Sequence, residues 1–161
     1  MNKVALIVSF AAVLAVFAFS LASCKSTSCD RELRDRLAIR ELVDRYAVES
    51  DRGNQDYYRN IFWKDITLRQ IANGNVFNEF HDVEDVVRVF KSAGATKISY
   101  HQTGQQVVNF SDASHATGTT YLIALLGNET ATPIYIRYED TFEKIGGRWW
   151  ITARDQYFVY R

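Results

Sequence analysis

The chain has 161 residues and carries 19 basic and 19 acidic side chains, so its formal net charge is zero. That balance leaves no basic excess to drive binding to nucleic acid, so no nucleic-acid partner is expected, and the length is that of one domain with a leader segment. Aromatic residues make up 14% of the chain, enough to line an apolar pocket or to pack a core.

The first 23 residues have the layout of a secretory signal peptide. A short basic start containing Lys3 precedes residues 4–22, which are apolar except for Ser9 and Ser20. Residues 21–23 are followed by Cys24 and resemble a lipobox, the cleavage site of bacterial lipoproteins. The resemblance implies that Cys24 becomes the first mature residue and carries lipid. An uncleaved signal-anchor helix is the alternative.

A lipidated Cys24 implies a protein anchored in the bacterial cell envelope, with the lipid as its only membrane contact. Lys25 follows the cysteine, which by analogy favours the periplasmic side of the outer membrane in a Gram-negative host. We assign residues 24–30 to an acylated tether and residues 31–161 to the domain. Acylation leaves Cys29 alone, so no internal disulfide is expected.

Three helices are predicted in the first part of the domain. Residues 30–50 have apolar side chains at three- and four-residue steps, and Gly53 follows as a left-handed cap. Residues 55–63 form a second, short helix. Residues 81–92 form the third, with Asp82 as its N-cap.

Strands are predicted at residues 66–71 and then, from residue 97 onward, in a period-two pattern. These later strands cover residues 97–109 (interrupted near Gly104), 115–126, 134–144 and 148–160. Helices followed by a long antiparallel sheet indicate an α+β fold in which three N-terminal helices pack on a curled sheet.

Four segments in this order resemble the SnoaL-like group of the nuclear-transport-factor-2-like superfamily, in its scytalone-dehydratase-like branch. They are Ile39-Arg40-Glu41-Leu42-Val43-Asp44-Arg45-Tyr46 with Asp51-Arg52-Gly53-Asn54; Ile61-Phe62-Trp63-Lys64-Asp65-Ile66; Ser99-Tyr100-His101-Gln102-Thr103-Gly104; and Tyr138-Glu139-Asp140-Thr141-Phe142 with Gly147-Arg148-Trp149-Trp150-Ile151 and Arg154. The resemblance covers nearly the whole mature chain. It implies a cone-shaped α+β barrel with a pocket between helices and sheet.

The resemblance also implies a catalytic pair, Asp51 and His101. Dehydratase-like members have an aspartate at the end of the first helix and a histidine on a barrel strand, and these two residues fall at those places. Elimination of water next to a carbonyl needs a base for the α-proton and an acid for the leaving hydroxide. An imidazole oriented by a carboxylate can serve as both. The competing interpretations are a surface turn aspartate and a structural strand histidine.

Other site residues are less defined by the sequence. The dehydratase's second histidine and its paired tyrosines have no convincing match, although a tyrosine such as Tyr46 could substitute. Arg154 and Asp140 form a buried ion pair or point into the pocket, with the structural role favoured. The histidines have no metal-ligand spacing, so no metal site is predicted. The predicted substrate-binding residues are Tyr46, Trp63, Tyr100, Tyr121 and Trp150.

Three functions remain open. The first is a cofactor-free dehydratase or isomerase acting on a small hydrophobic hydroxy or keto compound. The second is a non-catalytic lipoprotein that binds an apolar ligand. The third is an interaction module that forms a homodimer through its open sheet face, using alternating apolar residues such as Ile134, Ile136 and Trp149.

Overall fold

The computed structural model describes residues 28–93 and 96–159, so the predicted signal peptide and Cys24 lie outside the described residues. The chain divides into two compact units, Met1–Leu37 and Ala38–Arg161. In the first unit residues 28–37 are helical, and Cys29 is exposed. No helix within the described ranges is long and apolar enough to cross a membrane.

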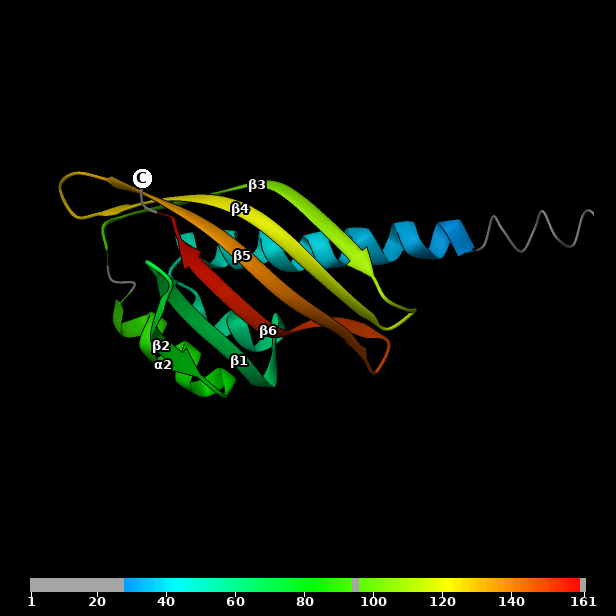
Figure 1. Cartoon of the computed structure of the whole chain (residues 1–161). Coiled ribbons are helices and arrows are strands. Elements are labelled where there is room, and N and C mark those ends of the chain that lie inside the picture. Colours follow the sequence, from blue (N-terminus) through cyan, green and yellow to red (C-terminus); the bar gives the residue numbers. More distant parts are fainter. Residues whose placement is uncertain (1–27, 94–95, 160–161) are drawn as a thin grey trace, which may run out of the picture. The chain divides into compact units, whose positions relative to one another are not determined.

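The helices agree with the predicted positions, with changes at their ends (Figure 1). Residues 28–51 are helical, including residues 28–30 that we had assigned to the tether. Gly53 has a φ of 68° and supplies the left-handed residue beyond the helix. The second helix is a short 3-10 helix, η1 (Gln55–Asn60). The third, α2 (Val83–Ala93), begins after Asp82, whose Oδ1 accepts from the Asp85 N–H at 2.8 Å.

Six strands form one curled sheet in the order β2-β1-β6-β5-β4-β3. The strands are β1 (Phe62–Ala72), β2 (Asn75–Phe80), β3 (Ile98–Phe110), β4 (His115–Gly127), β5 (Thr132–Ile145) and β6 (Arg148–Phe158). The sequence did not predict β2, and β1 begins earlier than predicted. The prediction of an antiparallel sheet is wrong for one pair of strands, because β1 and β6 pair in parallel. The α+β class is confirmed.

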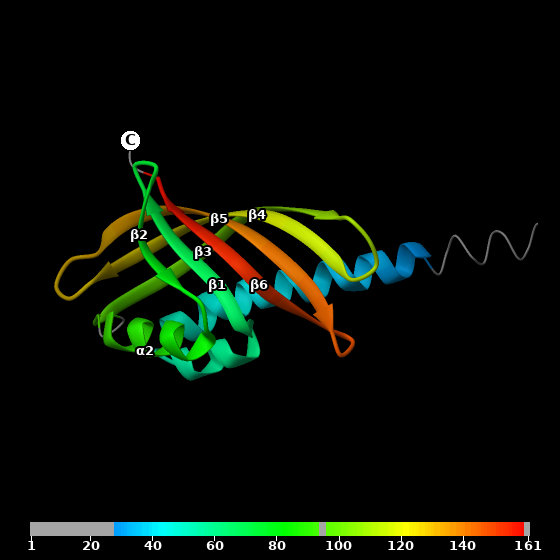
Figure 2. The same ribbon diagram turned by 60° about the horizontal axis from the view of Figure 1, so that its bottom comes forward.

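The two faces of the sheet differ in chemistry. On the inner face, which packs against helical residues, the side chains are buried; they include Leu122, Ala124, Ile136, Tyr138 and Ile151. Figure 2 shows α2 on this side of the strands. Side chains of the alternate residues point to the outer face, since successive residues of a strand project in opposite directions.

The interruption predicted near Gly104 is present as a shift of register between Thr103 and Gln106 in the β3–β4 pairing. Such an irregularity bends a strand and increases its twist. β3 is also an edge strand, with β4 as its one neighbour in the sheet of the described residues. The N–H and C=O groups on its unpaired side can therefore form hydrogen bonds with side chains of the helix.

Candidate functional site

Asp51 and His101 lie in direct contact. The Nδ1 atom of His101 is 2.6 Å from Oδ1 of Asp51, and the main-chain N–H of His101 donates to Oδ2 at 2.9 Å. The hydroxyl of Ser99 donates to the same Oδ1 at 3.0 Å. Because a carboxylate only accepts hydrogen bonds, Nδ1 is the donor in this contact, and in the neutral form of the ring Nε2 has the lone pair. Nε2 has no hydrogen-bond partner among the described residues.

The local sequence explains how this contact forms. Asp51 is the last helical residue of the segment 28–51. Ser99 and His101 are two residues apart on β3 and therefore share a face. The His101 N–H points away from β4, and the carboxylate satisfies it in place of a further strand. The side chains of His101 and Asp51 are 11% and 24% exposed, so the pair borders solvent.

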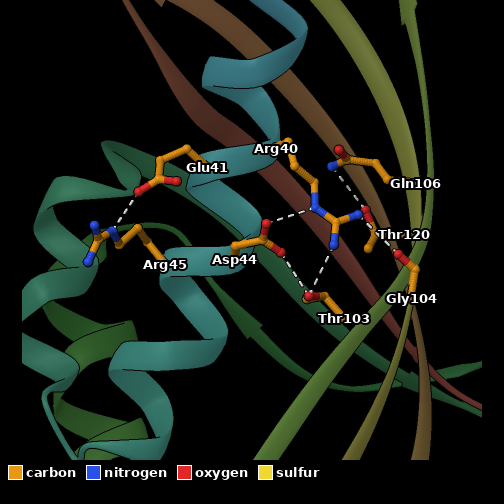
Figure 3. A network of polar contacts seen from close by, with 8 residues as sticks. All are labelled: Arg40, Glu41, Asp44, Arg45, Thr103, Gly104, Gln106 and Thr120. Atoms are coloured by element: carbon orange, nitrogen blue, oxygen red, sulfur yellow. Dashed lines mark hydrogen bonds and ion pairs between the residues drawn. The ribbon is translucent and has the colours of Figure 1, made fainter.

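A second polar bridge joins the same helix to β3 (Figure 3). Oδ1 of Asp44 accepts from the Thr103 hydroxyl at 2.8 Å, and Oδ2 accepts from Nε of Arg40 at 2.9 Å. Arg40 in turn donates to the carbonyl oxygen of Gly104 at 3.0 Å. The Asp51–His101 pair thus belongs to a polar seam between helix and edge strand. These contacts hold the helix against β3.

Aromatic side chains lie on the buried side of the pair. The Tyr46 ring is 3% exposed and meets the His101 ring edge to face, at 6.5 Å between centroids. Tyr46 also stacks on Tyr58 at 5.0 Å and meets Tyr138 at 5.9 Å. Burial raises the pKa of all three tyrosines, although the positive charge of Arg154 acts in the opposite direction. They therefore remain neutral donors at physiological pH.

Arg154 is fully buried beside this tyrosine cluster. Its Nε and Nη2 donate to the two carboxylate oxygens of Asp140, at 2.7 and 2.9 Å. Its guanidinium carbon lies 3.9 Å from the Tyr138 ring centroid and 4.8 Å from that of Tyr46. Burial alone would lower the pKa of Arg154, but the charge of Asp140 raises it above its ordinary value. Of the two predicted alternatives, the buried ion pair is present.

The five predicted substrate-binding residues are not brought together. Only Tyr46 contacts the Asp51–His101 pair. Tyr100 and Tyr121 are 53% and 51% exposed and lie on the outer face, since His101 and Leu122 beside them face inward. Trp63 and Trp150 pack on each other, with ring centroids 5.6 Å apart. They point away from the face on which their neighbours Phe62 and Ile151 are buried.

A groove of about 860 Å³ lies on the outer face, across β3, β4 and β5. Its lining includes Gln102, Tyr121, Ile123, Pro133 and Tyr135. The three apolar residues predicted for this open face are not on it. Ile136 and Trp149 are buried in the core, at 5% and 2% exposed, and Ile134 packs against that core.

Sequence reasoning missed three contributors to the site. Ser99 could have been found as the residue two positions before His101, because that spacing places both on one face of a strand. Tyr138 and Tyr58 are brought to Tyr46 by tertiary packing and carry no local signal. Within the described ranges no group of three or more metal-binding side chains occurs.

Comparison with known proteins gives a family for this arrangement. The family model described as a SnoaL-like domain matches residues 31–155. No curated protein sequence matches the chain. Among solved structures, a Novosphingobium aromaticivorans protein with the provisional name scytalone dehydratase has a TM-score of 0.72 at 16% identity, covering 81% of this chain and 88% of its own.

Two further structures share the fold. A type 2 hexachlorocyclohexane dehydrochlorinase, LinA, has a TM-score of 0.69 at 16% identity, covering 81% of this chain and 88% of its own. The beta subunit of a provisionally named aromatic-ring-hydroxylating dioxygenase from Novosphingobium aromaticivorans has a TM-score of 0.68 at 16% identity, covering 81% and 93%. The names range from eliminating enzymes to a subunit of a larger enzyme, so the shared fold does not decide the reaction.

Proposed function

Because the chain belongs to the family of SnoaL-like domains, we propose that it is a cofactor-free acid–base enzyme, a lyase or isomerase that acts on a small hydrophobic hydroxy or keto compound. The observation that carries the proposal is the contact of Asp51 with both the ring and the main chain of His101. This double contact holds the imidazole in one orientation and one tautomer.

In the proposed reaction, Nε2 of His101 removes a proton from a carbon next to a carbonyl group. Asp51 stabilises the imidazolium that results. The electrons of the broken C–H bond form a carbon–carbon double bond. In an elimination, the imidazolium returns its proton to the departing hydroxyl, which leaves as water; in an isomerisation, the proton returns to another carbon. Proton transfer of this kind contributes about 10²- to 10⁴-fold in rate.

The similar structures support an elimination as the first reaction to test. One carries the provisional name of a dehydratase and another is a dehydrochlorinase. Both names describe loss of a small molecule across a carbon–carbon bond. The substrate that fits the proposal is therefore a hydrophobic β-hydroxy ketone. Hexachlorocyclohexane, which has no hydroxyl or carbonyl group, tests whether the same base also drives the loss of chloride. Acetophenone serves as a simpler probe, because exchange of its methyl protons in heavy water reports proton removal alone.

The experiment compares the wild-type domain with His101→Asn on these three compounds. We expect elimination or deuterium exchange with the wild type and at least a hundredfold loss in the variant. His115→Asn is a matched control, because His115 forms a second contact with an aspartate, Asp112, at 2.9 Å, but is exposed. Full activity in His101→Asn, or no wild-type activity on any of the three, would contradict the proposal.

A homodimer through the outer face is the second candidate function. Tyr121, Ile123 and Tyr135 are 51%, 38% and 54% exposed there and border the groove. Neighbouring exposed apolar side chains of this kind favour a protein partner. A second copy of the chain offers the same surface and can pair with it about a twofold axis. This interface lies on the opposite face of the sheet from His101, so the dimer is compatible with catalysis.

The lipid anchor at Cys24 is also a proposal. Its support is the order of basic start, apolar run and cysteine in the sequence. We propose that the domain is held at the periplasmic side of an outer membrane by this lipid. Labelling of the full-length protein with radioactive palmitate in a Gram-negative host tests it. Label should be absent from Cys24→Ser and retained in Cys29→Ser; label retained in Cys24→Ser would overturn the proposal.

A further inference from the structure

The first helical segment, residues 28–37, exposes a row of apolar side chains. Leu33 and Leu37 are 57% and 62% exposed, and Cys29 is exposed as well. These three residues are four positions apart, so they form one stripe along the helix. Asp35, on the other side of the segment, is 8% exposed. A surface helix normally turns its polar side outward, so the stripe of Cys29, Leu33 and Leu37 indicates a partner.

Arginine side chains lie at both edges of this stripe. Helical spacing places Arg36 beside Leu33 on one edge and Arg34 beside Leu37 on the other. Arg36 forms an ion pair with Glu32 at 2.7 Å, whereas Arg34 has no ion pair within the described ranges. Guanidinium groups bind phosphate oxygens well. An apolar stripe bordered by arginine is typical of a helix that lies in the surface of a membrane.

The short chain between the stripe and Cys24 indicates which partner covers it. Under the proposed lipidation, Cys24 is held at the membrane. Five residue steps separate Cys24 from Cys29, and they span at most about 18 Å. The helical segment 28–37 is itself about 15 Å long. The bilayer is therefore the apolar surface that the anchor brings next to the stripe.

We propose that the stripe of Cys29, Leu33 and Leu37 docks on the surface of a phospholipid bilayer, an inference that rests on the proposed lipid at Cys24. The leucine side chains enter the boundary between head groups and acyl chains, and the flanking arginines bind lipid phosphates. This contact is additional to the lipid, which the sequence predicts as the only membrane contact. A chain held by lipid alone can turn on its tether, whereas a second contact holds the helix along the membrane.

The experiment uses the full-length protein, expressed in a Gram-negative host and purified as the mature lipoprotein. It is reconstituted in vesicles of phosphatidylethanolamine and phosphatidylglycerol. With Cys24 acylated, Cys29 is the remaining thiol and takes the fluorophore NBD. Lipids with a doxyl group on the acyl chain quench this label only where it enters the bilayer. We expect quenching in the wild type and its loss in Leu33→Glu combined with Leu37→Glu, because carboxylates stay in water.

The matched control is Val76→Glu combined with Val107→Glu. These valines are 48% and 60% exposed on strands of the sheet, so the control adds the same two charges at exposed apolar positions away from the stripe. Quenching should persist in this variant. Equal loss in both double variants would show a general effect of charge and overturn the inference.

Mass spectrometry of the same samples separates the two proposals. An acylated wild type without quenching, or equal quenching in the wild type and in Leu33→Glu combined with Leu37→Glu, would overturn this inference and leave the anchor in place. A wild type without lipid on Cys24 would overturn the anchor and, with it, this inference. A second copy of the chain is the other candidate to cover the stripe. A disulfide between the Cys29 residues of two unlabelled chains in vesicles, together with absent quenching, would assign the stripe to that copy instead.

Discussion

Asp51 uses both oxygens of its carboxylate to hold His101, one on the ring Nδ1 at 2.6 Å and one on the main-chain N–H at 2.9 Å. The second contact makes the first directional. A carboxylate that contacted only the ring could move with the ring as the His101 side chain rotates. Because the main-chain N–H of His101 also holds the carboxylate, Nδ1 can contact it in one position. Nε2 is then fixed as well, on the far side of the ring.

Replacing the Asp51 carboxylate should lower the catalytic rate more than replacing its hydrogen-bond partner Ser99. In Asp51→Asn, the amide can donate to Nδ1 and favour the wrong tautomer, and the imidazolium loses its counter-charge. We expect acetophenone exchange to fall about 10²-fold or more. Ser99→Ala removes one hydrogen bond of 3.0 Å and should lower the rate less than tenfold. Equal rates in Asp51→Asn and the wild type would mean that the pair is only structural.

The buried ion pair should show strong coupling in stability. Asp140→Leu leaves the guanidinium of Arg154, which is 0% exposed, without its counter-ion. We expect the free energy of unfolding to fall by about 3–5 kcal/mol. The double variant with Arg154→Met should recover most of that loss, because apolar side chains then fill the site. Urea unfolding of the two single variants and the double variant measures the coupling, and additive losses would contradict it.

Gly118 should not tolerate a side chain. A Cβ at this position would lie 2.9 Å from Cε2 of Phe142 and 3.2 Å from the carbonyl oxygen of Val107. Phe142 is fully buried, so its ring has little room to move. We expect Gly118→Ala to lower the free energy of unfolding by about 1–3 kcal/mol. Thr117→Ala is the control on the exposed face of β4, and a Gly118→Ala variant as stable as this control would refute the packing argument.

A carboxylate far from the site should contribute to stability in a defined pH window. The Ser114 N–H and the His115 side chain lower the pKa of Asp112 from 3.8 to about 2. Because the folded pKa is lowered, the charged form stabilises the fold above pH 4 and this contribution is lost as the pH falls toward about 2. Asp112→Asn should therefore lower the thermal midpoint at pH 6, and the difference should vanish near pH 2. A difference independent of pH would contradict the assignment.

The proposed dimer can be tested on β4. Ile123→Lys puts a charge in the outer groove, where its neighbours are apolar, and should convert a dimer into a monomer by light scattering. Thr117→Lys adds the same charge on the same face of the strand but outside this groove, and should leave the dimer intact. A wild-type chain that is monomeric at high concentration would overturn the dimer. Catalysis should persist in Ile123→Lys, because His101 lies on the inner face.

The sequence by itself determined the class of fold and the identity of the central pair. Period-two alternation after residue 97 and helical spacing after residue 30 reflect local geometry, so they can be read without tertiary information. The interruption of the strand near Gly104 and the cap at Gly53 are local as well. Asp51 and His101 were found by resemblance to a family. A resemblance gives the position of a residue in a known fold, which periodicity does not.

Tertiary structure alone decided which aromatic residues face the pair. Because successive side chains of a strand alternate, Tyr100 and His101 must point in opposite directions. Which of the two points inward depends on how the sheet curls and where the helix packs. Tyr121 and Trp150 were placed in the pocket for the same reason and lie elsewhere. The parallel pairing of β1 with β6 and the packing of Tyr46 against Tyr138 depend on contacts between distant segments. No local pattern encodes such contacts, because they arise only when the strands are brought into register.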